Sequence, residues 1–252
     1  MTAFEGLVLF VSGLTGGALS AAAGGASFVT FPALILTGLS PLAANTTNFV
    51  GLITAQPTAL ATSYRSELRV LGRRLIPSLA TALVGGIAGA ELLLHTGESG
   101  FSALAPWLML LATSMFAAGP TLQTAITRAV KTPLHGNSLL CQAFIFLFSV
   151  YCGYFGAGVG MMLLGVLAVF GYDDIHQANA VKNAVVMISS MVATVIYGLS
   201  GPVAWPAAFV LIAGATLGAY AGGVIAKRAP QHLLRIGLIG LGAIFTIYLF
   251  WR

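Results

Sequence analysis

Two interrupted apolar segments, one in each half of the chain, constrain the fold more than any other feature of the sequence. They cover about residues 26–37 and 159–170, and each follows a cluster of small residues rich in glycine. In both copies a glycine lies 13 positions before another one: Gly25 before Gly38, and Gly158 before Gly171. Each segment is too short to span a bilayer, which needs about 20 apolar helical residues. Paired short segments in matching halves are typical of a transporter's binding site.

The other apolar stretches are long enough to span a membrane. Only 7% of the 252 residues are charged and 58% are hydrophobic, whereas soluble domains carry about 25% charged residues. We therefore predict an all-α polytopic membrane protein that forms a single transmembrane domain over residues 1–252. The eight expected long helices cover about 4–22, 42–63, 74–94, 104–124, 138–155, 176–199, 203–226 and 232–251. The two short segments add two short or broken helices at mid-membrane.

The two halves match beyond their opening glycines. The stretch 44–48 matches the stretch 178–182, and this places Asn45 opposite Asn179. Pro77, Gly85 and Gly89 also match Pro206, Gly214 and Gly218 with identical spacing. Several matches in the same order predict an internal duplication, with repeat 1 at about 1–131 and repeat 2 at about 132–252.

The positions of the basic residues predict that the two repeats have inverted topology. Lys and Arg concentrate on cytoplasmic loops. In the first half they follow the third segment, at Arg65, Arg69, Arg73 and Arg74. In the second half the corresponding loop, 200–202, is uncharged, and the next loop carries Lys227 and Arg228. Matching loops would thus face opposite sides, with both termini outside.

The number of crossings in each half stays open at this point. Each short segment either crosses the membrane, which gives five passes per half, or returns beside the preceding helix as a re-entrant hairpin, which leaves three. Both arrangements have an odd number of crossings, so the charge pattern fits either one.

The glycine clusters predict a binding site for an anion. A helix that starts inside the bilayer presents unpaired N–H groups and a partial positive charge. Two facing helix starts would bind an anion without a buried arginine. The alternative is close helix packing by small residues. The candidate residues of the two starts are Gly24, Gly25, Ala26 and Ser27 in the first copy and Gly156, Gly158 and Gly160 in the second.

Polar residues just after the short segments complete the candidate site. Asn45 and Asn179 can donate hydrogen bonds to an oxyanion, or to backbone groups left unpaired where a helix is interrupted. Thr46 is a weaker candidate. Lys182 lies about 9 Å into its predicted helix and can balance an anionic substrate or carry a proton. Its alternatives are snorkelling to the interface or pairing with an aspartate at the helix start. Gln56, beside an expected kink at Pro57, is a further candidate for the cavity.

The sequence contains no metal-ligand spacing, nucleotide-binding motif or catalytic motif. We therefore expect no cofactor, no metal site and no enzyme activity. The net charge of +5 comes from short loops that read as orientation signals, so nucleic acid is not an expected partner. Cys141 and Cys152 are about 16 Å apart along one helix, too far for a disulfide with each other. The expected partners are membrane lipid and a small anion.

The motifs resemble the two signatures of the sulfite exporter TauE/SafE family of membrane transporters. The first is carried by Gly24-Gly25, Pro32-Ala33-Leu34, Gly38, Pro41, Ala44-Asn45-Thr46 and Tyr64-Arg65, and the second by Gly156-Ala157-Gly158-Val159-Gly160, Gly171, Ala178-Asn179, Lys182-Asn183 and Gly201 with Trp205. The sequence departs from the family pattern at Ala23, Ala26 and Ala180-Val181, around the expected site. The resemblance covers nearly the full chain. It implies transport of sulfite, thiosulfate or organosulfonates across a bacterial or archaeal plasma membrane.

These observations predict a secondary transporter for small anions with alternating access at the membrane midplane. Coupling would be to a proton or another ion, or transport would run downhill. A small-anion channel and a non-transporting membrane subunit are the alternatives. The exact substrate, the direction of transport and the oligomeric state stay open.

Overall fold

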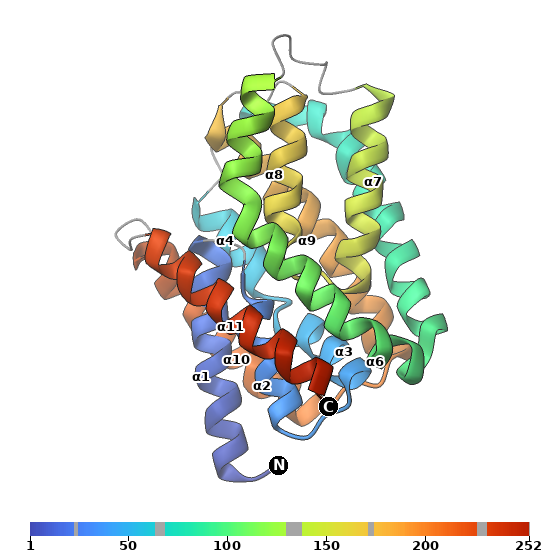
Figure 1. Cartoon of the computed structure of the whole chain (residues 1–252), viewed down its shortest axis with the longest axis vertical. Coiled ribbons are helices and arrows are strands. Elements are labelled where there is room, and N and C mark those ends of the chain that lie inside the picture. Colours follow the sequence, from blue (N-terminus) through green and yellow to red (C-terminus); the bar gives the residue numbers. More distant parts are fainter. Residues whose placement is uncertain (23–24, 64–68, 130–137, 171–173, 226–230, 252) are drawn as a thin grey trace.

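In a computed structural model the chain forms a bundle of helices (Figure 1), and the residues described are 1–22, 25–63, 69–129, 138–170, 174–225 and 231–251. These parts of the chain contain helices, turns and loops but no strand, which confirms the predicted all-α class. The helices are α1 (Ala3–Ala22), α2 (Ser27–Leu36), α3 (Pro41–Gly51), α4 (Ala55–Ser63), η1 (Gly72–Leu75), α6 (Ile76–Ala129), α7 (Leu139–Tyr154), α8 (Val159–Val169), α9 (Ile175–Ser200), α10 (Trp205–Ile225) and α11 (Gln231–Trp251).

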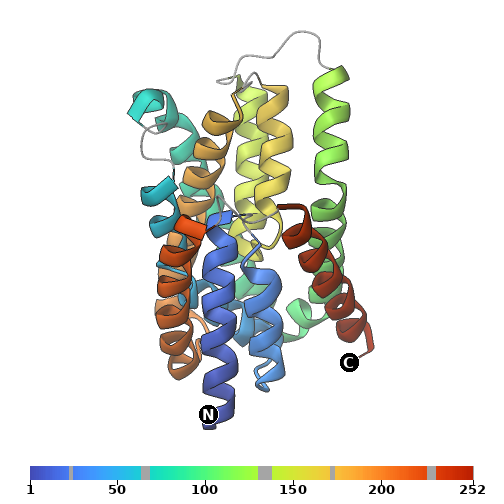
Figure 2. The same ribbon diagram turned by 90° about the vertical axis from the view of Figure 1, so that its left-hand side faces the viewer.

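The lengths and compositions of these helices are those of a multi-pass membrane protein. Four described helical segments are long and apolar enough to cross a bilayer, and four shorter apolar helices accompany them. Large apolar side chains such as Leu199 and Trp251 are exposed on the outside of the bundle, where they would face lipid. Both termini lie at the same end of the molecule (Figures 1 and 2).

The structure corrects one of the expected long helices and agrees with two others. The helix expected at 42–63 is broken into α3 and α4, with turns at residues 52–54. Pro57 explains this break, because its ring displaces the carbonyl four residues earlier and it has no N–H to donate. The helices expected at 74–94 and 104–124 are both present within α6, which is broken at Gly97, where φ is 67° and ψ is −177°.

The two short helices each form a hairpin with the helix before them. Thr37 and Leu39, just after α2, share a pocket with Met1 and Glu5, at the start of α1, so α2 returns to the end at which α1 begins. At α8 the ring of Phe170 lies 6.3 Å from that of Phe144, near the start of α7. The two hairpins enter from opposite ends of the bundle (Figures 1 and 2). This antiparallel packing is compatible with a re-entrant hairpin, and the number of crossings in each half stays a prediction.

The two halves of the chain pack against each other through two glycine-lined interfaces of similar design. On α10, Gly218 lies against the backbone of Leu14 on α1, and on α6, Gly89 lies against the backbone of Val150 on α7. Gly17 against Ala215 and Gly153 against Gly86 extend the same two interfaces. Gly89 and Gly218 are also a pair matched by sequence spacing. This reciprocal packing supports the inverted repeat, which stays a proposal.

Adding a methyl group at these interface glycines is expected to lower the melting temperature in detergent. A Cβ at Gly89 or Gly218 would collide with the carbonyl oxygen of Val150 or Leu14, and backbone cannot move aside as a flexible side chain can. Gly240→Ala on α11 is the matched control, because nothing lies within 4 Å of its added Cβ. We expect Gly89→Ala and Gly218→Ala each to cost about 1–3 kcal/mol. If Gly240→Ala lowered the melting temperature as much as Gly89→Ala or Gly218→Ala does, this expectation would be contradicted.

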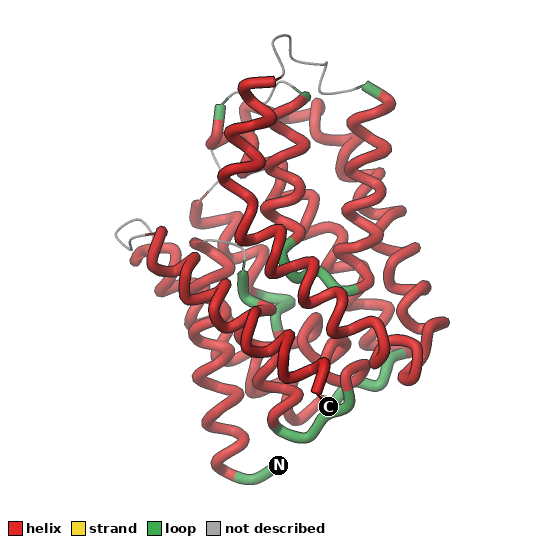
Figure 3. Tube along the Cα trace, viewed as in Figure 1, coloured by secondary structure: helices red, strands yellow, loops and turns green. Residues whose placement is uncertain are grey.

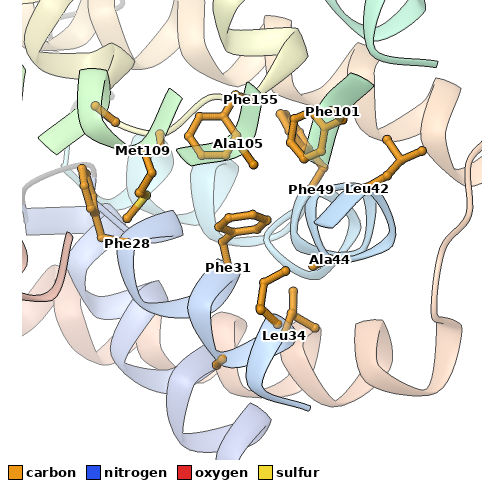
Figure 4. Packing of buried hydrophobic residues seen from close by; sticks show 14 of the residues in the cluster. Phe28, Phe31, Leu34, Leu42, Ala44, Phe49, Phe101, Ala105, Met109 and Phe155 are labelled. Carbon is orange, nitrogen blue, oxygen red and sulfur yellow. The ribbon is translucent and has the colours of Figure 1, made fainter. Parts of the chain in front are cut away.

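An aromatic cluster fixes the positions of the broken segments inside the bundle (Figure 4). The ring of Phe31, on α2, packs edge-on against Phe155, which follows α7, with ring centroids 5.5 Å apart. Phe28 contacts Phe116 on α6 at 5.4 Å. These side chains are at most 2% exposed. The aromatic contacts therefore tie the first hairpin to the second at the level where both are interrupted, and Figure 3 shows such non-helical segments inside the bundle.

Candidate functional site

Three interruptions of helices meet at one internal cavity. Its volume is about 60 Å³, several times the roughly 10–15 Å³ that one water requires. Ala26 and Ser27 come from the first hairpin, Leu52 and Ile53 from the break between α3 and α4, and Gly156 from the second hairpin. The remaining wall residues are Asn48, Phe49, Gln56, Phe155, Val159, Gly160, Lys182, Asn183, Val186, Ser190, Met191 and Thr194.

The second hairpin turns on two glycines with left-handed backbone. Gly156 has φ 78° and Gly158 has φ 75°, a region that other L-residues rarely adopt. An added Cβ at Gly158 would lie 3.1 Å from the carbonyl oxygen of Ala112 on α6, so the turn also needs the absence of a side chain. The hydroxyl of Tyr151 donates to the carbonyl of Ala157 at 2.8 Å. These features place the start of α8 at the cavity wall.

Asn48 links α3 to the start of α2. Its amide nitrogen donates to the hydroxyl oxygen of Ser27 at 3.1 Å, and its amide oxygen accepts from the hydroxyl of Thr30. Asn48 is 2% exposed, so both bonds are shielded from competing solvent. The amide thereby holds the first turn of α2 against the cavity.

Replacing Asn48 with alanine is expected to destabilise the protein. The change leaves the hydroxyls of Ser27 and Thr30 without this partner, and a buried polar group that loses its bond costs about 1–3 kcal/mol. Asn183→Ala is the matched control, because Asn183 lines the same cavity and makes no hydrogen bond recorded within the described residues. Thermal unfolding in detergent should separate the two. Equal melting temperatures would show that the Asn48 bonds contribute nothing to stability.

Lys182 places a positive charge in the cavity wall. The residue is 7% exposed, and its ammonium donates to the amide oxygen of Asn179 at 3.0 Å. None of the ion pairs found among the described residues includes Lys182. Asp174, one suggested partner, instead caps α9 by accepting from the backbone of His176, and Asp173 lies outside the described residues. A lysine at membrane depth costs about 2.5–3.5 kcal/mol, so an anion in this cavity would offset that cost.

The cavity is closed on the side toward the C-terminal end of α9. Thr194 donates to the carbonyl of Phe49 at 3.2 Å, and the Phe49 ring meets Tyr197 edge-on with centroids 5.2 Å apart. The hydroxyl of Tyr197, a fully buried residue, donates to the carbonyl of Gly153. Met191, another wall residue, is 38% exposed. The described contacts therefore close this side of the cavity, while Met191 extends from the wall to the surface of the bundle.

The structure brings together five of the residues chosen from sequence. Ala26, Ser27, Gly156, Gly160 and Lys182 all line the cavity. Gln56, a weaker hypothesis, lines it as well.

The remaining candidates lie beside the cavity or outside the described residues. Gly25 and Gly158 each lie one position before a wall residue, and Asn179 reaches the cavity through its bond to Lys182. Asn45 donates to the carbonyl of Tyr154 at 2.9 Å, and Thr46 donates to that of Pro202 at 3.0 Å. Gly24 lies outside the described residues. Substrate contact by any of these residues stays a prediction.

Sequence reasoning missed the polar face of α9. Asn183, Ser190 and Thr194 line the cavity, and their spacing of seven and four positions places them on one helix face. That spacing is a readable signal in the sequence. A search of the described residues finds no group of three His, Cys, Asp or Glu side chains that could hold a metal.

Comparison with known proteins gives a consistent result over nearly the whole chain. The model of the family described as sulfite exporter TauE/SafE matches residues 9–249. A probable membrane transporter protein from Haemophilus influenzae is 28% identical, over 90% of this chain and 88% of its own length. The probable membrane transporter protein YfcA from Escherichia coli K12 is 25% identical, over 97% and 89%. No solved structure matches the chain significantly.

Proposed function

Because the chain belongs to the sulfite exporter TauE/SafE family and is a multi-pass membrane transporter, we propose that its substrates are small sulfur-containing anions. The proposed cargo is sulfite, thiosulfate or an organosulfonate, moved across the plasma membrane. The family match and the names of the relatives carry the transporter assignment. The proposal of a small anion rests on the chemistry of the cavity, and the choice of sulfur-containing anions rests on the description of the family.

The observation that carries the substrate proposal is the charge of Lys182, which has no acidic partner among the described residues. The described wall contains this one cation, five neutral polar side chains besides Ser27, and no carboxylate. The five are Asn48, Gln56, Asn183, Ser190 and Thr194. Amide and hydroxyl groups can donate hydrogen bonds to oxyanions, and the start of α8 adds N–H donors and a partial positive charge. Such a wall favours a small oxyanion over a cation or a large apolar solute.

The proposed mechanism is alternating access between the two repeats. The seal formed by Phe49 and Tyr197 closes one side of the cavity, as one state of such a cycle requires. Rocking of the halves at the glycine-lined interfaces would open that side and close the other. Uptake with and without a pH gradient, measured as described below, separates proton coupling from coupling to another ion or downhill movement.

Uptake by proteoliposomes tests the proposal directly. Purified protein is reconstituted, and entry of labelled sulfite, thiosulfate, sulfonates and carboxylates is measured with and without a pH gradient. We expect saturable uptake of the sulfur anions and stimulation by unlabelled anion on the opposite side. Flux without saturation or such stimulation would favour a channel. Absence of flux from the purified chain would favour a subunit that needs a partner.

A further inference from the structure

The cavity wall contains two pairs of residues in corresponding places. Ser27 is the first residue of α2, and Gly160 is the second residue of α8. Asn48 and Lys182 are each the eighth residue of the helix that follows, α3 or α9. All four line the cavity. Comparing Ser27 and Asn48 with Gly160 and Lys182 therefore shows how the two sides of one cavity differ.

The first pair is neutral and already bonded within itself. The Ser27 side chain occupies the space at the start of α2, and its oxygen accepts from the Asn48 amide at 3.1 Å. The Asn48 oxygen is used by Thr30. The described bonds engage the acceptor of Asn48 and one of its two N–H donors, so this side can offer an anion neutral donors but no positive charge.

The second pair is charged and lacks a side chain at its first position. An added Cβ at Gly160 would lie 3.5 Å from Cδ and 4.0 Å from Nζ of Lys182, which is ordinary van der Waals contact. A gap of about one methyl group therefore separates Gly160 from the Lys182 side chain, and both residues line the cavity. The ammonium has three donors, and its one recorded bond is to Asn179. Backbone N–H groups of the first turn of α8 are close to this space.

We propose that the anionic group of the substrate binds on the second side, in the part of the cavity that Gly160 and Lys182 line. A side chain at Gly160 would crowd the ammonium from that side, so Gly160 determines which substrates fit. A single sulfonate, sulfite or similar oxyanion head binds there, and any remaining part of the substrate extends toward Asn48 and Ser27. This inference rests on the proposed function, since it assigns the position of that substrate.

Two substitutions of increasing size at Gly160 test the proposed binding position of the anion. Gly160→Ala and Gly160→Ser introduce one and two heavy atoms beside Lys182, and the 3.5 Å separation is an ordinary contact, so both variants should fold. We expect the apparent KM for sulfite uptake to rise about 3-fold for alanine and more than 10-fold for serine. The matched control is Gly240→Ser on α11, where nothing lies within 4 Å of an added Cβ. Melting temperatures in detergent identify any variant that has lost its fold.

A second measurement separates this inference from the proposed function. Stabilisation of the detergent-solubilised protein against heat by sulfite or methanesulfonate reports anion binding without transport. If the anion stabilises the wild type but not Gly160→Ser, the proposed binding position of the anion is supported, even if liposomes show no uptake. If folded Gly160→Ser protein takes up the anion at the wild-type rate with an unchanged KM, the proposed binding position is wrong and the proposed function is unaffected. A wild type that shows neither stabilisation nor uptake overturns both.

Discussion

Replacing Lys182 with methionine is expected to reduce sulfur-anion uptake by about 10- to 100-fold while leaving the protein as stable as before or more so. A hydrogen bond to a charged group contributes about 1.5–3 kcal/mol, and 1.4 kcal/mol corresponds to a factor of ten. Stability should not fall, because the change removes a charge that is 93% buried and has no acidic partner among the described residues. Uptake by proteoliposomes and melting temperature in detergent measure the two effects.

Two further variants make the Lys182 result specific. Lys182→Arg keeps the charge but changes the geometry, so we expect it to recover part of the uptake. Arg235→Met removes a positive charge elsewhere in the bundle, where the guanidinium donates to the carbonyls of Phe116 at 3.2 Å and Ala117 at 2.6 Å. That variant should lower the melting temperature with no change in apparent KM. Wild-type uptake by folded Lys182→Met protein would remove Lys182 from the mechanism.

Replacing Gly158 with valine is expected to cause the largest loss of folded protein among these variants. Gly158 has φ 75°, and the left-handed region costs an L-residue about 1–2 kcal/mol, with a β-branched side chain worst placed. The added side chain also meets the Ala112 backbone, whose carbonyl oxygen would lie 3.1 Å from its Cβ. The turn that positions α8 would have to open, so transport should be lost together with stability.

Gly38→Val is the matched control for this second prediction. Gly38 has φ 89°, so valine suffers the same kind of backbone strain, but nothing lies within 4 Å of the added Cβ. The difference in melting temperature between the two variants therefore reports the packing of the second hairpin against α6. Equal losses of folded protein in both variants would show that only the backbone conformation matters.

Particular residues show how far sequence reasoning reached at the site. Ser27, Gly160 and Lys182 could be chosen because each lies a short, countable distance from a glycine cluster, and all three line the cavity. Asn45 has the same kind of position in the sequence, yet its recorded bond is to the carbonyl of Tyr154, 109 positions away. Whether an amide faces a cavity or a broken backbone depends on partners that are distant in the chain.

The seal and the polar face of α9 depended on such distant contacts. The Phe49 ring meets the Tyr197 ring across the two halves, and the Tyr197 hydroxyl donates to the carbonyl of Gly153, 44 positions away in the chain. Ser190 and Thr194 enter the wall because α9 passes beside α3 and α4. Their helical spacing could be seen in the sequence, but the sequence did not show that this face of α9 points to the cavity.

The sequence by itself determined the membrane setting, the helical class, the positions of both glycine breaks and the family signatures. These properties follow from local composition and spacing, because a bilayer accepts only apolar helices with internally satisfied backbone. Tertiary structure decided that each short helix packs back along the helix before it, and that the two sides of the cavity differ. The physical reason is that hairpins, cavities and seals are made by contacts between segments far apart in the chain, which local periodicity does not encode.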